Sequence, residues 1–332
     1  MRYLVFLSCV LSIFSCKEAK TDFQLTGSAL GTTYAIQYSG LEAQDYQKQL
    51  DSIFNVVNQS MSTYIPTSDI SKINAGDASV KVDEMFEEVL TLSKEVHRAS
   101  EGAFDPTVGQ LVNAYGFGSA KGLKEIDSIT VDSLLQGVGL DKVILTPEKT
   151  IKKLHPSVYL EFNAIAKGYC IDRIGAFLNQ KGIQHYLIEL GGELLAKGQN
   201  VVKQKDWVVG IDDPTAIEER VITETMRLKD RAMATSGNYR KFRIDSLTGN
   251  KYVHSINPLT GYPQIGNVLS VSVLASSCAL ADAYATTFMI MDLATTKALL
   301  GQHPELDVYI IYADVDGELE IFSTQGFEDL ML

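Results

Sequence analysis

The chain has 332 residues, of which 45% are hydrophobic and 21% are charged, a composition typical of folded globular proteins. Its length allows one large domain or two lobes with a proper core. The formal net charge of −12 argues against nonspecific binding to nucleic acid, because such binding requires Lys and Arg to neutralise phosphates. We therefore expect no nucleic-acid partner.

The first residues have the pattern of a signal peptide. Arg2 is followed by an apolar run that is too short to span a membrane, and the run ends in I-F-S-C. This ending, with a small residue before Cys16, resembles the lipobox of bacterial lipoproteins. We predict a signal peptide over 1–15, lipidation of Cys16 within a tether over 16–22, and a lipid-anchored protein on the periplasmic side of a bacterial membrane. Ordinary cleavage without a lipid is the alternative.

Hydrophobic spacing and turn residues predict the following elements in chain order. Two strands flank Gly31, and helices are expected over 42–58, 83–100 and 131–140. A further helix follows Glu161 and is closed by Gly182. The remaining strands are expected at 185–190, 193–198, 207–211, 222–228, 239–244, 268–274, 307–312 and 318–322, with a hairpin turn at 245–250 and a helix at 278–291. Because strands and helices are interspersed without regular βαβ alternation, we predict an α+β domain over 23–330, with two lobes that share a cleft.

Two cysteines remain as side chains of the predicted domain. Cys170 and Cys278 both lie in apolar helical segments, and neither belongs to a zinc-binding spacing. They either form one disulfide or stay as two buried free thiols.

Two polar stretches interrupt the apolar pattern and are candidates for a site. In E-G-A-F-D-P-T-V-G at 101–109, Gly102 permits a tight turn and Asp105 precedes a proline. The stretch is either functional or a structural loop with an Asx-turn. Lys167 lies near the beginning of an apolar helix, where backbone N–H groups favour anions, so it suits a phosphate. The alternative is a lysine on the surface that extends its ammonium group into water.

Two further features combine residue types that carry chemistry. His254 lies before an N-P-x-T-G turn, in a polar setting where functional residues concentrate, although a lone histidine is often structural. Asp282 and Thr286 are four residues apart, which places two hard oxygens on one face of an apolar helix. This pair suits Mg²⁺ or Ca²⁺ and not zinc. The alternative is an aspartate bonded to a neighbouring loop and a threonine bonded back to its own helix.

Eight motifs, taken in order, resemble the ApbE family. They are A-L-G-T-T-Y, M-S-T-Y-I-P-T-S-D-I-S-K-I-N, G-A-F-D-P-T-V-G-Q-L-V-N-A-Y-G-F-G, A-I-A-K-G-Y-C-I-D, I-E-L-G-G-E, A-T-S-G-N-Y-R-K-F, H-S-I-N-P-L-T-G-Y-P and A-D-A-Y-A-T-T-F-M. The resemblance covers about residues 23–325. Members of this family are Mg²⁺-dependent FAD:protein FMN transferases and are often periplasmic lipoproteins. The resemblance implies a two-lobed, T-fold-like α+β domain with mixed β-sheets and a flavin cleft between the lobes.

The resemblance also implies a set of site residues. FAD would be contacted by Leu30, Tyr64, Ala103, Phe104, Asp105, Glu161, Lys167 and Ile256. Mg²⁺ would be held by Asp282, Thr286 and the backbone carbonyl of Ala164. The family commonly has Met in place of Leu30 and Asp-Leu-Gly in place of residues 161–163. Glu161 therefore keeps the charge on a longer side chain.

The implied reaction moves FMN from FAD to a Thr or Ser hydroxyl of an acceptor flavoprotein, such as a redox-pump subunit, and releases AMP. Mg²⁺ and Lys167 would neutralise the pyrophosphate, with Asp282 as the essential metal ligand. His254 would be the base that takes the hydroxyl proton. Two alternatives are a FAD pyrophosphatase, with water as the acceptor, and a flavin-binding lipoprotein that does not turn over.

Overall fold

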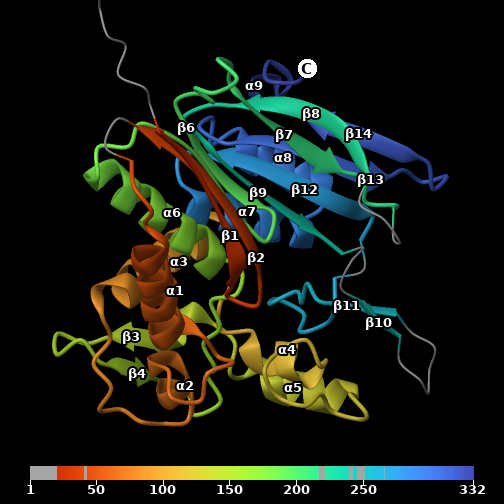
Figure 1. The fold of residues 1–332 in the computed structure, drawn as a ribbon. Helices are drawn as coiled ribbons and strands as arrows, with labels where there is room; N and C mark the ends of the chain where they lie inside the picture. Colours follow the sequence, from red (N-terminus) through yellow and green to blue (C-terminus); the bar gives the residue numbers. More distant parts are fainter. Residues whose placement is uncertain (1–20, 41–42, 217–220, 239–241, 245–250, 265) are drawn as a thin grey trace, which may run out of the picture.

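The computed structural model describes residues 21–40, 43–216, 221–238, 242–244, 251–264 and 266–332. Its centre is an eight-stranded sheet with the strand order β1-β2-β5-β6-β9-β12-β13-β14 (Figure 1). These strands are β1 (Thr21–Ala29), β2 (Thr32–Gly40), β5 (His185–Leu190), β6 (Glu193–Lys197), β9 (Ala232–Gly237), β12 (Val268–Ala275), β13 (Asp307–Ala313) and β14 (Leu319–Ser323).

Neighbouring strands of this sheet pair antiparallel throughout. The predicted α+β class is confirmed, but the expectation of mixed sheets is wrong. The physical reason is that β1–β2, β5–β6 and β13–β14 are consecutive strands joined by short turns, and such turns can only join antiparallel strands.

Two of these turns lie at the edge of the sheet where the site is built. The β1–β2 turn consists of Leu30 and Gly31, with φ angles of +49° and +76°. The β5–β6 turn consists of Gly191 and Gly192, with φ angles of +65° and +104°. Two central residues with positive φ match the twist of an antiparallel hairpin. The second turn fixes Glu193 as the first residue of β6.

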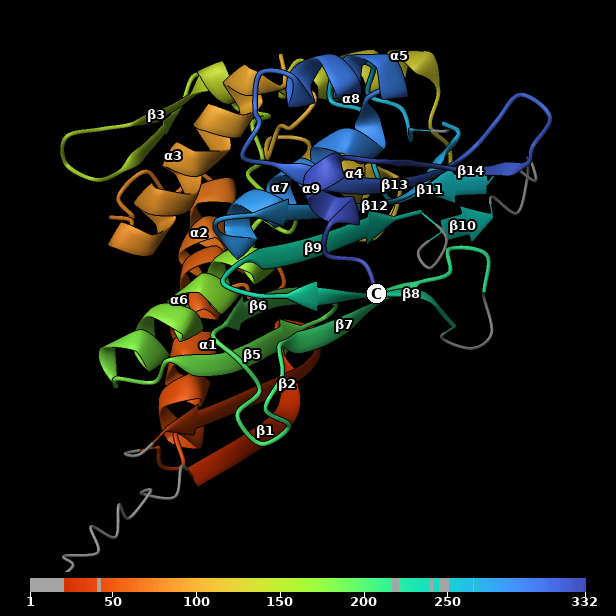
Figure 2. The ribbon, with the colours of Figure 1, turned by 90° about the horizontal axis from the view of Figure 1, so that it is seen from above.

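One face of the sheet is covered by helices. These are α1 (Gln47–Met61), α3 (Glu84–Ala99), α6 (Ala166–Gln180), α7 (Cys278–Ile290) and α8 (Leu293–Leu300). Their apolar faces pack on inward-pointing strand residues such as Ile36, Ile188 and Val271, which are fully buried. Figure 2 shows α1, α3 and α6 together on one side of the strands. The predicted helices at 42–58 and 83–100 are confirmed as α1 and α3.

The opposite face of the sheet is covered by a second, smaller core. The hairpin of β7 (Trp207–Asp212) and β8 (Ile222–Leu228) lies across it together with α9 (Gln325–Glu328). Trp207, Met226 and Phe327 pack there against side chains of the central strands. Because both faces are covered, the side chains of a central strand alternate between two cores, and a polar side chain such as that of Glu193 can be buried there.

A set of shorter elements lies beyond the helices. It comprises α2 (Asp69–Asn74), α4 (Gly109–Ala114), α5 (Ser128–Leu135), the 3₁₀ turn η1 (Leu140–Lys142), β3 (Val143–Leu145), β4 (Ile151–Lys153), β10 (Phe242–Ile244) and β11 (Lys251–Val253). The helix predicted over 131–140 is α5, which ends earlier, before Gly137 and Gly139. The strands that flank the predicted hairpin pair as β10 and β11, while the turn at 245–250 lies outside the described residues.

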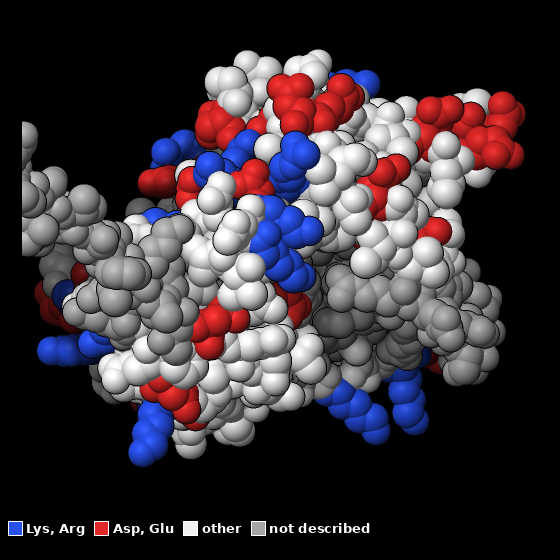
Figure 3. Space-filling model, turned by 45° about the horizontal axis from the view of Figure 1, so that its top comes forward, with Lys and Arg blue, Asp and Glu red and all other residues white. Residues whose placement is uncertain are grey.

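The surface in Figure 3 carries basic side chains interspersed with acidic ones, with no continuous basic surface on that face. Within the described ranges, no helix is long and apolar enough to cross a membrane. The predicted signal peptide over 1–15 and the lipidated Cys16 lie outside the described residues. Strand β1 begins at Thr21, within the segment predicted as a tether.

Candidate active site

The site is built where α6 and α7 cross in close contact. A Cβ atom on Gly168 would lie 2.3 Å from the carbonyl oxygen of Cys278, so only glycine permits this approach. The Asp172 carboxylate accepts hydrogen bonds from the N–H groups of Cys278 (2.7 Å) and Ala279 (2.8 Å) and thereby caps α7 from α6. Cys170 and Cys278 are buried free thiols, so the disulfide alternative is not realised.

Three charged side chains meet beside this crossing. Lys167 donates a hydrogen bond to Oε1 of Glu193, and its Nζ lies 3.8 Å from Oδ1 of Asp282. The second Asp282 oxygen accepts a hydrogen bond of 3.2 Å from the N–H of Gly168. Glu193 and Asp282 are 4% and 3% exposed. The ammonium group of Lys167 therefore points to buried carboxylates, and the alternative of a lysine extended into water is excluded.

The charges of this cluster perturb one another strongly. Burial raises the pKa of Glu193 to about 7 and raises the pKa of Asp282, and Lys167 opposes both shifts. Burial acts to lower the pKa of Lys167, but the two carboxylates outweigh it and raise that pKa. With both carboxylates ionised, two anions and one cation give the cluster a net negative charge, which favours the binding of a further cation.

The predicted metal ligands supply uncommitted oxygens next to this cluster. The hydroxyl of Thr287 donates to the carbonyl of Ala283 (2.8 Å), whereas the hydroxyl of Thr286 has no hydrogen bond within the described residues. The N–H of Gly168 would bond to the carbonyl of Ala164 in a longer helix, but it donates to Asp282 instead. The alternative in which Thr286 bonds back to its own helix is therefore not realised, and Thr287 makes that bond instead.

This donor set fits a hard divalent cation. It combines one carboxylate with a hydroxyl and a backbone carbonyl, and Mg²⁺ and Ca²⁺ prefer such oxygen ligands. Among the described residues, no group of three or more His, Cys, Asp or Glu side chains could hold a metal ion. A zinc site or a site built only from carboxylates is therefore not formed in the described part of the chain.

The loop at 101–107 begins with two residues of positive φ and is held by hydrogen bonds to the last turn of α3. Glu101 and Gly102 have φ angles of +50° and +88°. The N–H of Phe104 donates to the hydroxyl of Ser100 (3.1 Å), and Nδ1 of His97 lies 2.9 Å from the carbonyl oxygen of Phe104. The backbone of the predicted FAD contacts Ala103 and Phe104 is thus fixed from the last turn of α3.

Both carboxylate oxygens of Asp105 accept hydrogen bonds from other groups of the protein. Oδ1 accepts from the N–H (2.8 Å) and the hydroxyl of Thr107 (2.5 Å), and Oδ2 accepts from the N–H of Leu140 (3.1 Å). The Asx-turn alternative for this stretch is therefore realised. The side chain is 6% exposed, and burial raises its pKa. A contact between Asp105 and FAD stays a prediction, and it would have to involve the backbone.

The segment at 159–163 is bonded both to α2 and to the loop at 101–107. Asn74 on α2 bonds both the N–H and the carbonyl of Leu160 (2.8 Å each), and the N–H of Glu161 donates to the carbonyl of Pro106 (2.7 Å). Burial raises the pKa of Glu161 to about 7, against a hydrogen bond from Asn163. Partial burial, followed by the charge of Glu161, raises the pKa of Tyr64, a residue that is 58% exposed. Tyr64, Glu161 and the loop at 101–107 therefore lie along one surface.

His254 and Ile256 lie beside a third, small core, which is formed around α4 and α5 beyond the helices. His254 directly follows β11, and its ring centroid lies 6.4 Å from that of Phe117 in an edge-to-face arrangement. Ile256 is 5% exposed and packs with Leu111 and Tyr115 of the α4 segment. With Leu30 at the β1–β2 turn, the predicted contacts come from five parts of the chain, and their contact with a flavin stays a prediction.

Glu193 was missed in the sequence analysis, although it is the closest partner of Lys167. A usable signal was present in I-E-L-G-G-E. The Gly-Gly pair predicts a tight turn, and the alternation that follows places Glu193 on the same face as Leu195 and opposite to Leu194. Leu195 packs toward Gly175 on α6, so Glu193 also faces the helices.

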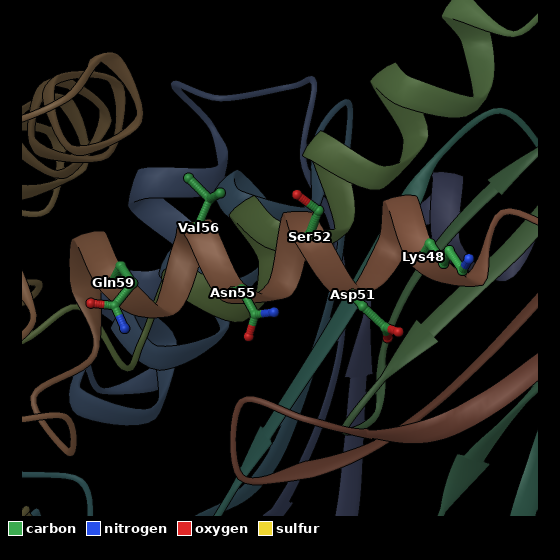
Figure 4. A pocket seen from close by; sticks show the side chains of 6 residues that line it. All are labelled: Lys48, Asp51, Ser52, Asn55, Val56 and Gln59. Carbon is green, nitrogen blue, oxygen red and sulfur yellow. The ribbon is translucent and has the colours of Figure 1, made fainter.

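Two surface hollows lie apart from the charged cluster, and the second borders the predicted FAD contact Asp105. One of about 490 Å³ follows the outer face of α1, where Figure 4 shows Lys48, Asp51, Ser52, Asn55, Val56 and Gln59. One of about 910 Å³ lies behind the loop at 101–107, between α3, the segment at 135–145 and Leu259. Neither is lined by Lys167 or Asp282, so neither marks the centre of the proposed chemistry.

Comparison with known proteins identifies the family. The model of the ApbE family matches residues 30–310. Proteins named FAD:protein FMN transferase from Haemophilus influenzae and Vibrio cholerae are 32% and 33% identical to this chain, over 95% and 97% of it and 93% and 97% of their own lengths. The solved structure of the flavin transferase ApbE from Vibrio cholerae superposes with a TM-score of 0.84 at 30% identity, covering 94% of this chain and all of that one. That of the flavinyl transferase ApbE from Pseudomonas stutzeri, in its apo form, gives 0.82 at 25% identity, covering 94% and 97%. The family predicted from the eight motifs is thus confirmed, and the chain belongs to the ApbE family.

Proposed function

We propose that this protein is a FAD:protein FMN transferase, which moves FMN from FAD to a hydroxyl group of an acceptor protein and releases AMP. The observation that carries the proposal is the buried cluster of Lys167, Glu193 and Asp282 beside the uncommitted oxygens of Thr286 and Ala164. With a divalent cation bound, such a site could neutralise the charge of a pyrophosphate. The shared name of the full-length relatives supports the same activity.

We further propose that Asp282, Thr286 and the carbonyl of Ala164 hold Mg²⁺. When bound, the ion supplies Lewis-acid stabilisation of the charge on the pyrophosphate oxygens. Support comes from the negative charge of the cluster and from the two oxygens that have no hydrogen-bond partner in the described part of the protein. The preference of hard cations for such oxygens favours Mg²⁺ over zinc.

The side chains of this chain would perform the rest of the reaction. The ammonium group of Lys167 offsets the negative charge that develops on the departing AMP phosphate. His254 accepts the proton of the acceptor hydroxyl as that oxygen forms its bond to the FMN phosphorus. The bond from this phosphorus to the bridging oxygen breaks at the same time, and AMP leaves with the bridging oxygen. The predicted contacts at 103–105, Tyr64, Glu161, Leu30 and Ile256 would orient FAD.

The setting of the reaction is also a proposal. The signal peptide over 1–15 and the lipobox at Cys16 support a lipid-anchored enzyme on the periplasmic side of a bacterial membrane. The acceptor would then be an extracytoplasmic flavoprotein, such as a redox-pump subunit.

One incubation separates the proposal from its alternatives. The protein is mixed with FAD and Mg²⁺, with and without the flavin-acceptor domain of a redox-pump subunit. Covalent FMN on the acceptor, detected by mass, supports transfer. AMP release that is equal without the acceptor identifies a pyrophosphatase, and flavin binding without AMP identifies a storage protein.

His254 is tested in the same assay. The variant His254→Ala should lose about 10²- to 10⁴-fold in transfer rate, because general-base catalysis contributes that much. Its FAD affinity, measured by flavin fluorescence, should be retained. Flavinylation by His254→Ala at the parent rate would remove histidine from the mechanism and leave the transferase proposal intact.

A further inference from the structure

Lys167 and Asp282 each have a role in the proposed reaction, whereas Glu193, the third member of the buried cluster, has none. It begins β6, where the Gly191–Gly192 turn fixes the backbone and the alternation of the strand directs its side chain toward α6. Its Oε1 accepts a hydrogen bond from Lys167. The position of the carboxylate is thus set by a rigid sheet edge and not by a loop.

The second oxygen of Glu193 is buried and has no hydrogen-bond partner among the described residues. An unpaired buried carboxylate oxygen is costly, so folding stability alone does not favour this arrangement. Replacement of a buried ion pair by apolar side chains is often neutral or stabilising. The presence of a charged Glu193 therefore calls for a reason other than stability.

Lys167 has two carboxylate partners, and only Glu193 can bind it without also serving as a ligand of the proposed metal ion. Asp282 lies at 3.8 Å from Nζ and is also the proposed metal ligand, so its charge would be shared with a cation. Glu193 makes the closer contact and is not among the proposed ligands. It can hold the ammonium group in place whether or not Asp282 is engaged.

We propose that Glu193 is a positioning residue of the transfer reaction, which holds the ammonium group of Lys167 at the place where charge develops on the leaving phosphate. The inference rests on the proposed function. Glu193 acts through Lys167 and needs no contact with the reacting atoms. The interaction matters most in the transition state, so its loss lowers kcat more than it changes the KM for FAD.

The test is a double-mutant cycle on the full chain with FAD, Mg²⁺ and the acceptor domain. Glu193→Gln keeps the shape and one oxygen acceptor but removes the charge. We expect kcat to fall about ten- to hundredfold, the value of a charge-assisted hydrogen bond, with the KM for FAD changed less than about threefold. In a Lys167→Met background the same change should cost less than about threefold, because the group that Glu193 positions is absent.

Three controls make the outcome decisive. Glu193→Asp keeps the charge and should recover most of the lost kcat. Glu189→Gln removes the same charge from the opposite face of β5, where Oε1 accepts from the N–H of Gly192 (2.8 Å), and should behave as the parent. Titration with FAD counts the binding-competent molecules, which a purely structural role of Glu193 would reduce.

The results separate two kinds of failure. An equal cost of Glu193→Gln with and without Lys167, or a Glu193→Gln variant as active as Glu189→Gln, overturns the inference. A parent protein that transfers no FMN overturns the proposed function instead. Should Glu193→Gln fail to fold, Glu193→Ala in both backgrounds gives the same coupling measurement, because it also removes the carboxylate.

Discussion

Two regions of the proposed site use their polar residues in opposite ways. At the α6–α7 crossing, the side chains of Lys167 and Asp282 face each other across a short gap, and the backbone only fixes their places. At the loop over 101–107, the carboxylate of Asp105 is consumed by hydrogen bonds to the protein itself, and the backbone is what remains to meet a ligand. The first region therefore presents charged side chains, and the second presents a fixed backbone conformation.

This difference teaches how an aspartate should be interpreted from a motif. Asp105 and Asp282 are equally buried, at 6% and 3% exposure. Asp105 accepts three hydrogen bonds from nearby donors, whereas Asp282 accepts one from Gly168 and otherwise faces a lysine. The number of bonds already made, and not burial, distinguishes a structural carboxylate from one available to a metal ion.

The largest expected effect tests the first region. Asp282→Ala should lower the rate of FMN transfer by at least about 10³-fold, because it removes the only carboxylate among the proposed Mg²⁺ ligands. Lys167 keeps Glu193 as its partner, so the fold should be retained. Transfer is measured by acceptor mass and folding by circular dichroism. A folded Asp282→Ala variant with full activity would contradict the proposed metal site.

The sequence was sufficient for elements with strong periodicity. The helices α1, α3, α6 and α7 and most strands of the central sheet follow from the spacing of apolar residues, because each element buries one face or both. The strand β9 was not predicted, since its residues A-M-A-T-S-G lack the β-branched alternation that marks strands. The short helices α2 and α8 were missed because one or two turns give little periodic signal.

The site was predictable where one residue type requires a partner. A charged residue in an apolar helix must be paired, which drew attention to Lys167 and Asp282. The turn and the alternation in I-E-L-G-G-E mark Glu193 as a candidate, but its pairing with Lys167 could not be derived, because the two residues are 26 positions apart and the contact depends on which strand faces α6. Asp105 was left with two interpretations because its donors include Leu140, 35 residues further along the chain.

The next prediction tests the second region. Asp105→Ala leaves the N–H groups of Thr107 and Leu140 without their acceptor in a buried place. We expect the free energy of unfolding to fall by about 2–4 kcal/mol, measured by denaturant titration. Asp141→Ala, on the exposed turn beside it, should change this free energy by less than about 0.5 kcal/mol. An Asp105→Ala protein of parental stability would remove the structural role assigned to this carboxylate.

A smaller effect comes from two adjacent threonines on α7. Thr286→Val should lower the transfer rate about tenfold and raise the Mg²⁺ concentration required, because it removes a weak neutral oxygen ligand. Thr287→Val removes a buried hydroxyl that bonds only to the carbonyl of Ala283. It should retain activity and lose at most about 1 kcal/mol of stability. Reversed phenotypes would show that the wrong threonine has been assigned to the metal ion.

The smallest expected effect concerns Glu161, which lies between the two regions. Burial raises the pKa of Glu161 from its ordinary value of 4.5 to about 7 in the folded protein. A raised pKa of an acid means that the folded state binds the proton more tightly. The stabilisation is therefore complete below pH 4.5 and is lost as the pH rises to about 7.

Glu161→Gln mimics the protonated form at every pH and isolates this contribution. Compared with the parent, the variant should gain about 1–2 kcal/mol in free energy of unfolding between pH 4.5 and 8, a value reduced by the partial exposure of the side chain. Denaturant titrations of both proteins across this range measure the difference. A difference that does not change with pH would place Glu161 in a solvated setting, and the segment at 159–163 would then provide no buried link between the loop and the charged cluster.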